Sequence, residues 1–320
     1  MLAEEYQRWK SALVESCSNG SAVVVKDGGQ VVSEGIAYGM LIAAGMDDRP
    51  VFDGLWQFYT EHLDERGLMN WSMGVCEAPG DNDSNAATDA ELDAAMALLQ
   101  AHARWPDGGY LDAARALAAL ILEHEVDLDC VGRTVLRPGD AFGGCRDQNG
   151  QNRINPSYFA PGYYAVFAAF FPEQATVWTD LRDDTYALYN IYQTRMDGLV
   201  PDWSATDGSD WYGATYWYDA CRTPWRVATD YAWTADERAL AVLMGFTDWV
   251  DSNGGLPQAA QQNNSAFLGA FALAGCYDPA KFDTYMSSWL SAGGDDGPYF
   301  QATLRMIYLL LAGGRFPSTL

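Results

Sequence analysis

The sequence predicts an all-α protein, and three observations carry that prediction. Apolar residues recur at helical spacing from one end of the 320-residue chain to the other. Glycine, aspartate, asparagine and proline cluster between these stretches, as in KDGG, WPDGG and SAGGDDGP, and such clusters are typical of loops. Alternating patterns typical of strands are scarce, and only residues 22–26 and 30–32 fit short strands.

Four stretches show the helical spacing most clearly, and they predict helices of about 10 to 15 residues. Their apolar stripes are Ile36, Met40, Ala43 and Ala44; Leu92, Met96 and Leu99; Leu117, Leu120 and Ile121; and Leu304, Ile307, Tyr308 and Leu311. A helical domain of this size needs a closed or layered arrangement to bury so many stripes. Periodicity alone leaves a bundle, a solenoid and a toroid open.

The charge of the chain excludes some partners. The formal net charge is −24, so nucleic acid and anionic membranes are not expected to bind. No apolar run reaches the roughly 18 residues that a membrane span needs. The acidity fits either a solvated surface, as in salt-adapted proteins, or a cationic substrate.

The N-terminal sequence and the cysteines bear on location. MLAEEYQRWK lacks the regions of a signal peptide, so either the protein is cytoplasmic or the chain starts after a removed signal. Six cysteines without a C-x-x-C pair argue against a zinc or redox motif, and we expect no metal or cofactor. They fit three disulfides in a secreted protein, with six buried thiols as the alternative. The preferred pairs are Cys17–Cys76, Cys130–Cys145 and Cys221–Cys276.

Many aromatic residues fall in loops or at helix ends rather than in helical stripes. They are Trp71, Phe142, Tyr158, Trp203, Trp211, Tyr212, Tyr216 and Trp217. Aromatic rings stack on apolar faces, such as those of sugar rings, while their polar tips form hydrogen bonds. These residues therefore suit a carbohydrate groove, although large aromatics also fill protein cores.

Glu34 lies at the start of an apolar helix, within VVSEGIAYGMLIAAGM. Ser33 is a candidate N-cap, which places Glu34 in the first turn, where the helix dipole favours an ionised carboxylate. A general acid instead needs a raised pKa, which burial or a second carboxylate supplies. The residues alone favour a helix-start role and leave catalysis open.

A second acidic stretch, ATDAELDAAMALL, also begins a predicted helix. Thr88 or Asp89 is a candidate N-cap, and Asp89, Glu91 and Asp93 are well placed for the helix dipole. Favourable dipole interactions account for Glu91 and Asp93 without any function.

A third acidic residue, Asp219, lies between aromatic residues in YWYDACRTPWRV and precedes Arg222 by three positions. Side chains at this spacing meet on a helical turn, so Arg222 would keep Asp219 ionised. An ionised, oriented carboxylate is what a general base requires. The alternative is a purely structural ion pair.

Taken together, these segments resemble glycoside hydrolase family 8, the bacterial endoglucanases with an (α/α)6 barrel of six inner and six outer helices. The matching motifs, in order, are VSEGIAYGMLIA, FDGLW, GLMNW, ATDAELDAAMALL, NPSYFAPGYYAVF, GLVPDW and YDACRTPWRVATDY. They run from about Trp9 to Gly313, which implies a single catalytic domain over residues 1–320. The implied activity is endo-hydrolysis of β-1,4 bonds in cellulose-type or mixed-linkage β-glucan by a secreted monomer.

The resemblance implies an inverting mechanism with Glu34 as the general acid and Asp219 as the general base. Asp89 would bind the distorted sugar at the cleavage point and, by like charge, favour the protonated form of Glu34. In such a mechanism the two catalytic carboxyl groups lie about 6.5–9.5 Å apart. The implied substrate-binding residues are Trp71, Tyr158, Arg222, Tyr218, Phe142 and Tyr299.

Three departures from the family pattern concern the substrate site. The family usually reads ATDADLD or ATDGDED, and here Glu91 replaces the second aspartate of that motif. Phe142 stands where the family often has a tryptophan. Residues 145–153, CRDQNGQNR, have the character of an added loop that a Cys130–Cys145 disulfide would hold.

Other activities remain open at this point. The family also cleaves xylan and chitosan; its chitosanase branch lacks the aspartate that aligns with Asp219, whereas the acidity of the chain suits cationic chitosan. A carbohydrate-binding module would lack the acid or the base, and both Glu34 and Asp219 are present. A helical interaction scaffold would not need aromatic loops between acids.

Overall fold

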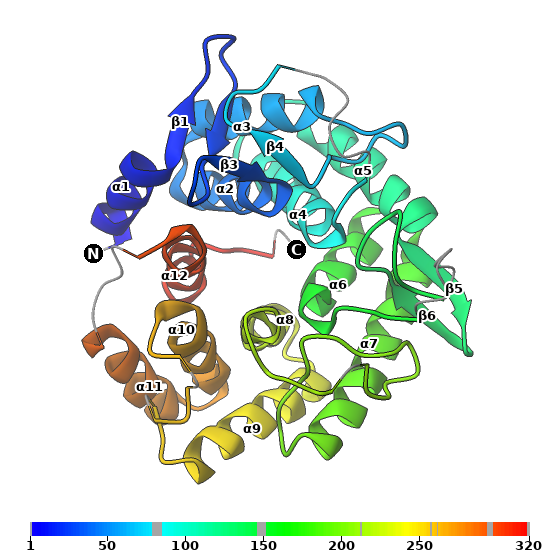
Figure 1. Ribbon diagram of the computed structural model, residues 1–320, viewed down its shortest axis with the longest axis vertical. Helices are drawn as coiled ribbons and strands as arrows, with labels where there is room; N and C mark the ends of the chain where they lie inside the picture. The colour runs from blue at the N-terminus through cyan, green and yellow to red at the C-terminus, as the bar shows by residue number, and fades with distance from the viewer. Residues whose placement is uncertain are drawn as a thin grey trace. The chain divides into compact units, whose positions relative to one another are not determined.

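The chain is mostly helical, as predicted (Figure 1). The computed structural model describes residues 2–78, 85–145, 152–211, 213–256, 258–260, 262–292 and 297–318. Within these residues the α-helices are α1 (Leu2–Leu13), α2 (Ser33–Met46), α3 (Arg49–Glu61), α4 (Thr88–Arg104), α5 (Tyr110–His124), α6 (Pro161–Phe170), α7 (Ala175–Arg195), α8 (Thr223–Thr234), α9 (Glu237–Ser252), α10 (Ser265–Ala274), α11 (Pro279–Ser291) and α12 (Tyr299–Ala312). Each of the four predicted apolar stripes lies on a helix: α2, α4, α5 and α12.

The described strands form three antiparallel pairs. They are β1 (Val14–Ser16) with β2 (Ala22–Val24), β3 (Gln30–Val32) with β4 (Ser72–Gly74), and β5 (Val126–Cys130) with β6 (Arg133–Leu136). The two predicted strands are therefore present, although the first ends at Val24. Three short 3₁₀ helices are η1 (Pro156–Tyr158), η2 (Ala220–Arg222) and η3 (Gly275–Tyr277).

The structure divides into two compact units. Within the described residues, the first unit contains α1 to α5 and α12, and the second contains α6 to α11. The single catalytic domain expected over residues 1–320 stays a prediction. No helix in the described parts of the chain is long and apolar enough to cross a membrane.

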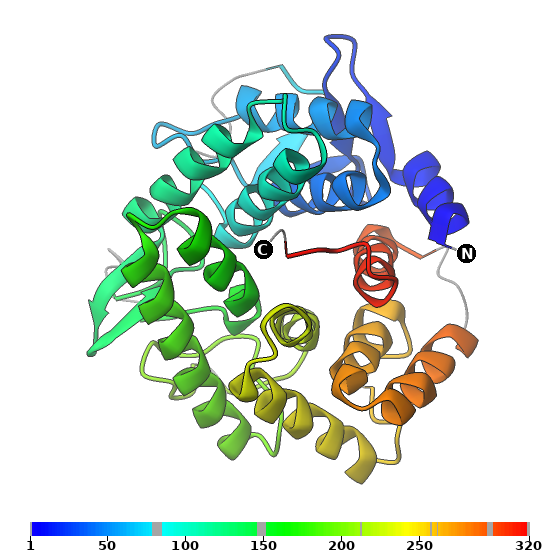
Figure 2. The same ribbon diagram turned by 180° about the vertical axis from the view of Figure 1, so that it is seen from behind.

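In the first unit, α2 and α4 form the centre of the core and pack against each other. Every residue from Gly35 to Gly45 of α2 is buried, as is every residue from Thr88 to Ala101 of α4. Helices α3, α5 and α12 pack against this pair (Figure 2). Gly39 allows β2 to approach α2 closely, because a Cβ at this position would lie 2.7 Å from Val24 Cγ2. Because α2 is surrounded by protein on all sides, it carries few polar residues.

In the second unit, buried and partly exposed helices also alternate along the chain. Helix α8 packs against α6, α9 and α10, while α7 covers α6 and α11 covers α10. Every residue of α10 is buried, whereas α9 buries only one face. One helix of each pair thus contributes to the core and the next one shields it from solvent.

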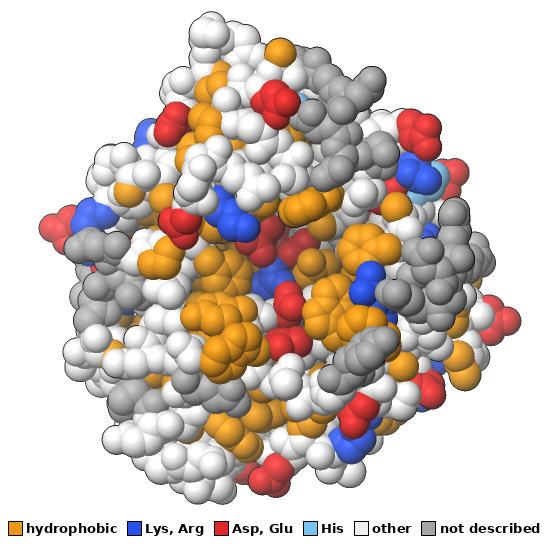
Figure 3. Space-filling model, viewed as in Figure 1, with side chains coloured by type: hydrophobic (Ala, Val, Ile, Leu, Met, Phe, Trp, Pro, Cys, Tyr) orange, Lys and Arg blue, Asp and Glu red, His pale blue; other side chains and the backbone are white. Residues whose placement is uncertain are grey.

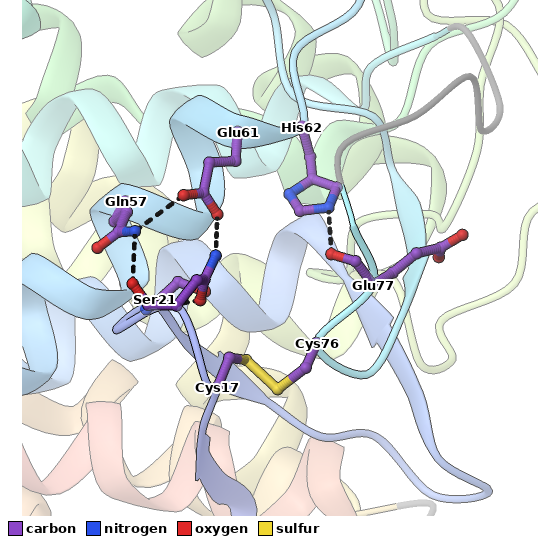
Figure 4. Close-up of a disulfide and its surroundings, with 8 residues drawn as sticks. Cys17, Ser21, Gln57, Glu61, His62, Cys76 and Glu77 are labelled. Atoms are coloured by element: carbon purple, nitrogen blue, oxygen red, sulfur yellow. Dashed lines mark hydrogen bonds between the residues drawn. A yellow bond between two sulfur atoms is a disulfide. The ribbon is translucent and has the colours of Figure 1, made fainter.

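Two of the three predicted disulfides are present. Cys17–Cys76 joins the loop after β1 to the segment after β4 in the first unit, as Figure 4 shows. The buried ring of His62 lies beside this segment, with Nε2 3.1 Å from the carbonyl oxygen of Glu77. Cys130–Cys145 joins the end of β5 to the first residue of the predicted added loop, of which residues 146–151 lie outside the described residues.

The third predicted disulfide, Cys221–Cys276, is wrong, because both cysteines are free thiols. Cys221 is buried in η2 and its Sγ donates to the carbonyl oxygen of Tyr218 at 3.2 Å. Burial raises the pKa of the Cys276 thiol to about 12. The Cys276 thiol therefore stays protonated at neutral pH, and Cys221 packs as a small buried side chain.

The predicted N-caps are also wrong by one position or more. Val32 caps α2 and Ala87 caps α4, and neither side chain forms a capping hydrogen bond. Backbone pairing fixes the start of α2 instead, since the Ser33 N–H donates to the carbonyl oxygen of Trp71 at 3.0 Å.

Glu91 lies in the first turn of α4, as the sequence predicted, but its environment is not that of an ordinary helix-start residue. Its side chain is fully buried, and Oε1 accepts the N–H of Met69 at 3.2 Å and the hydroxyl of Tyr59 at 3.4 Å. Burial, followed by the charge of Glu125, raises the pKa of Glu91 well above its usual range. The carboxyl group therefore stays protonated in the folded protein at pH values where an exposed glutamate ionises.

The buried Glu91 makes stability depend on pH. An unfolded glutamate titrates near pH 4.3, so the folded protein, which holds this proton more tightly, loses stability as the pH rises above about 4.3. Glu91→Gln cannot ionise and should gain stability relative to wild type between pH 5 and pH 8, by about 1 kcal/mol or more. Urea denaturation at both pH values measures this difference.

The matched control is Glu237→Gln, which changes an exposed first-turn glutamate on α9. It should give the same small effect at both pH values. An equal effect of Glu91→Gln at pH 5 and pH 8 would contradict the raised pKa.

Candidate active site

Glu34 occupies the first turn of α2, where β3 leads directly into the helix. The β3–β4 register pairs Val32 with Ser72, which brings the start of α2 next to Trp71. The half-buried Glu34 carboxyl accepts a hydrogen bond at Oε1 from the hydroxyl of Tyr299, at 2.8 Å. The fold thus fixes both the backbone and the carboxyl of the predicted acid.

Tyr299, the first residue of α12, is 2% exposed, and its ring lies over Gly35. A Cβ at Gly35 would lie 3.0 Å from the Tyr299 hydroxyl oxygen, so glycine leaves room for the ring. Burial and then the charge of Glu34 raise the pKa of Tyr299 well above its usual range. The phenol is therefore a neutral, permanent hydrogen-bond donor to Glu34.

Asp89 belongs to the same group of residues. It lies in the first turn of α4, is 2% exposed, and accepts the N–H of Ala90 at 3.1 Å. Its charge adds to the rise in the pKa of Tyr299, as does that of Glu34. The first unit thus brings together three predicted site residues, Glu34, Asp89 and Tyr299.

Trp71 has a fixed backbone and an exposed ring. Its N–H donates to the carbonyl oxygen of Asn85 and its own carbonyl accepts from Ser33, both at 3.0 Å. The preceding residue, Asn70, donates its N–H to the carbonyl oxygen of His62 at 3.0 Å. Since the side chain is 37% exposed, the ring is available for stacking on a sugar.

In the second unit, Asp219 and Arg222 form the predicted ion pair, with 3.1 Å between Oδ1 and Nη2. The pair spans η2, a 3₁₀ turn rather than an α-helix. Arg222 also donates to Ser157 Oγ at 2.9 Å, and its Cζ lies 5.2 Å from the centre of the Tyr158 ring. The second unit therefore brings Asp219, Arg222 and Tyr158 together.

Two neighbouring residues of the GLVPDW motif also hold Asp219. Sequence patterns predicted Trp203 only as a groove aromatic and gave Asp202 no role. Trp203 Nε1 donates to Asp219 Oδ2 at 3.0 Å. Asp202 Oδ1 accepts the N–H groups of Trp217 at 3.0 Å and Ala220 at 2.7 Å, on either side of Asp219. Burial is the main reason why the pKa of Asp202 is raised, and the charge of Asp219 acts in the same direction.

Tyr218 and Phe142 have different surroundings. The Tyr218 ring contacts Phe267 edge-on at 5.2 Å, and its hydroxyl accepts from Asn264 Nδ2 at 3.4 Å. Phe142 lies 5.4 Å from the guanidinium of Arg153, measured from ring centre to Cζ. Tyr212, another predicted groove aromatic, lies outside the described residues.

A cavity of about 650 Å³ lies beside the Asp219 loop in the second unit, and Asp202, Thr215 and Trp217 are among its lining residues. Trp217 is 41% exposed. Figure 3 shows hydrophobic groups exposed beside charged ones on the surface of the protein. Aromatic rings next to charged groups are what a polysaccharide site requires.

Comparison with known proteins decides the family. A model of the glycosyl hydrolases family 8 matches residues 2–314. The chain is a family 8 glycosyl hydrolase. The hydrolase is similar to Endoglucanase A of Acetivibrio thermocellus, with 32% identity over 347 residues covering 100% of this chain and 70% of that protein. It is also similar to a beta-glucanase of Niallia circulans, with 28% identity covering 98% of this chain and 84% of that protein.

Solved structures confirm the fold class of the hydrolase. The apo beta-1,3-1,4-glucanase of Paenibacillus sp. X4 matches with a TM-score of 0.85 and 26% identity, covering 98% of this chain and 91% of that one. A family 8 xylanase of Teredinibacter turnerae matches with a TM-score of 0.82 at 20% identity, which bears on the fold alone. These structures are (α/α)6 barrels, and the predicted fold class is confirmed.

The Tyr299 hydroxyl should matter for the rate. Tyr299→Phe keeps the ring and removes the hydrogen bond to Glu34. A hydrogen bond to a charged group is worth about 1.5–3 kcal/mol, so kcat on a soluble polysaccharide substrate should fall about 10- to 100-fold.

Tyr285→Phe is the matched control. The hydroxyl of Tyr285, on α11, also donates to a carboxylate, that of Asp251, with 2.5 Å between the hydroxyl oxygen and Oδ1. It should keep the wild-type kcat. Equal rates for Tyr299→Phe and wild type would show that the phenol does not orient Glu34.

Proposed function

We propose that this family 8 hydrolase is an inverting endo-β-1,4-glucanase that cleaves internal bonds of cellulose-type or mixed-linkage β-glucan. The observation that carries the proposal is the position of Asp219, whose carboxylate receives donors from Arg222 and Trp203. Two such donors fix the orientation of the carboxylate, as the position of a general base requires. Relatives named endoglucanase and beta-glucanase give further support.

In the proposed mechanism, Glu34 is the general acid. Its protonated carboxyl group donates to the glycosidic oxygen as the bond from that oxygen to the anomeric carbon breaks. The hydrogen bond from Tyr299 to Oε1 orients this carboxyl group. Asp89 binds the distorted sugar at the cleavage point.

Asp219 is the general base in this mechanism. It takes a proton from a water molecule whose oxygen attacks the anomeric carbon on the face opposite to the leaving group. The products are two shorter chains, the new reducing end has inverted configuration, and Glu34 and Asp219 exchange protons with solvent to complete the cycle. Tyr158, beside Arg222, is placed to contact the attacking water.

The sugar chain would bind to aromatic rings on both sides of the cleaved bond. Trp71 is the best candidate for a stacking platform because its ring is exposed and its backbone is held by hydrogen bonds to Ser33 and Asn85. Tyr218 would contribute a second ring next to the base. We further propose that the protein acts as a secreted monomer, which the two disulfides support.

Cleavage of xylan is the alternative that a specific observation favours. Structures from Teredinibacter turnerae and a relative from Paenibacillus barcinonensis, at 30% identity over 63% of this chain, have names that refer to xylan or xylose release. Chitosan is the second alternative, because the net charge of −24 would attract a polycation.

Removing either proposed catalytic carboxyl should abolish most of the activity. General acid or base catalysis contributes about 100- to 10,000-fold, so kcat for Glu34→Gln and Asp219→Asn should fall by such a factor. Reducing-sugar release on mixed-linkage β-glucan, hydroxyethyl-cellulose, xylan and chitosan measures this loss, and wild type should be fastest on a glucan. Near-wild-type turnover in either variant would refute the assigned role.

The stereochemistry of the first product tests the inverting mechanism separately. Proton NMR of a glucan digest, recorded before mutarotation, should show the α-anomer at the new reducing end. A β-anomer at early times would require a covalent intermediate and would exclude Asp219 as a base that activates water.

A further inference from the structure

Arg153 lies among three aromatic rings in the second unit. Its Cζ is 5.1 Å from the centre of the Trp211 ring, 5.4 Å from that of Phe142 and 5.5 Å from that of Trp203. Guanidinium groups within about 6 Å of a ring centre are attracted to its face. We call these four residues the Arg153 cluster.

The backbone around Arg153 is held from both sides. Its carbonyl oxygen accepts the N–H of Gly144 at 2.8 Å. The next residue, Ile154, exchanges two backbone hydrogen bonds with Ser204, at 2.8 and 3.1 Å. Arg153 is therefore placed by the fold, although it is the last residue of the predicted added loop.

The Arg153 cluster is continuous with the proposed base. Trp203 contacts Arg153 with its ring and donates to Asp219 Oδ2 with Nε1. One indole thus separates the guanidinium from the carboxylate that would activate water. A group at Arg153 is consequently close enough to act on the same sugar chain as Asp219.

The charge of Arg153 is not neutralised by a carboxylate within the described part of the chain. This is unusual in so acidic a protein, where Arg66, Arg182 and Arg238 all pair with aspartates. Arg153 is half-buried and its Nε lacks a hydrogen-bond partner among the described residues. Its terminal N–H groups can therefore donate to a ligand.

We propose that Arg153 is a specificity-determining residue that favours β-glucan chains carrying carboxylate substituents and disfavours chains of cationic amino sugars. The proposal rests on the glucanase function proposed above. A guanidinium binds a carboxylate through two parallel hydrogen bonds and repels an ammonium group. Phe142 and Trp211 hold the planar guanidinium group of Arg153 in place, which lowers the conformational entropy lost when a ligand binds.

Two cellulose ethers with the same backbone test this selectivity. Carboxymethyl-cellulose carries carboxylates and hydroxyethyl-cellulose is neutral. Arg153→Gln should lower kcat/KM about 10- to 100-fold on carboxymethyl-cellulose, as expected for losing a charge-assisted hydrogen bond, and by less than about twofold on hydroxyethyl-cellulose. Added salt of about 0.5 M should reduce the difference in kcat/KM on carboxymethyl-cellulose between Arg153→Gln and wild type, because salt screens charges.

Arg315→Gln is the matched control, since it makes the same change in net charge at an exposed residue after α12. It should leave the ratio of the two kcat/KM values unchanged. Arg153→Lys keeps the charge without the fork and should lower kcat/KM on carboxymethyl-cellulose about twofold, which provides a second measurement if Arg153→Gln folds poorly.

The proposal would be overturned if Arg153→Gln lost kcat/KM equally on both polymers, because Arg153 would then act only through Trp203 on the proposed base. If Arg153→Gln does not fold, equal losses in Arg153→Lys would overturn it in the same way. An unchanged kcat/KM on carboxymethyl-cellulose would overturn it as well. Failure of the glucanase proposal looks different: wild type would then hydrolyse neither cellulose ether.

Discussion

The hydrogen bond between Tyr299 and Glu34 is the contact that positions the proposed general acid. It joins the first residue of α12 to the first turn of α2, across 265 positions of sequence. Gly35 of α2 leaves room for it, because a Cβ at this position would lie 3.0 Å from the Tyr299 hydroxyl oxygen. Packing of α12 on α2 and orientation of the acid are therefore the same structural event.

Asp219, the proposed base, depends on a different kind of support. It lies in a loop immediately before η2, where few helical hydrogen bonds hold the backbone. The dipeptide Asp202–Trp203 supplies what the loop lacks, since Asp202 binds N–H groups on either side of Asp219 and Trp203 binds its carboxylate. A loop carboxylate held in this way keeps its geometry without belonging to a rigid element.

Sequence patterns predicted the helices well because burial of an apolar stripe depends mainly on spacing along one segment. They predicted the Asp219–Arg222 pair for the same reason, since both residues lie on one turn. They did not predict the bond from Trp203 to Asp219, because residues in a loop have no fixed spacing in space. The helix starts were misplaced because pairing of β3 with β4, a longer-range contact, positions Ser33.

Burial of charge was the feature that the sequence concealed. Glu91 has the spacing of a helix-start residue, and only the positions of Tyr59, Met69 and Glu125 reveal a buried carboxyl group. The disulfides show the same limit. An even number of cysteines is compatible with three bridges, but Cys221 instead donates to a carbonyl within its own turn.

The two disulfides lie in different units, and this arrangement bears on recovery from unfolding. Cys17–Cys76 encloses 59 positions of chain that carry Glu34 and Trp71, whereas Cys130–Cys145 encloses 15. A cross-link over a long loop restricts the unfolded chain more than one over a short loop. After denaturation without reduction, Glu34 and Trp71 therefore remain within a closed loop. The segment that bears them has fewer conformations to search during refolding.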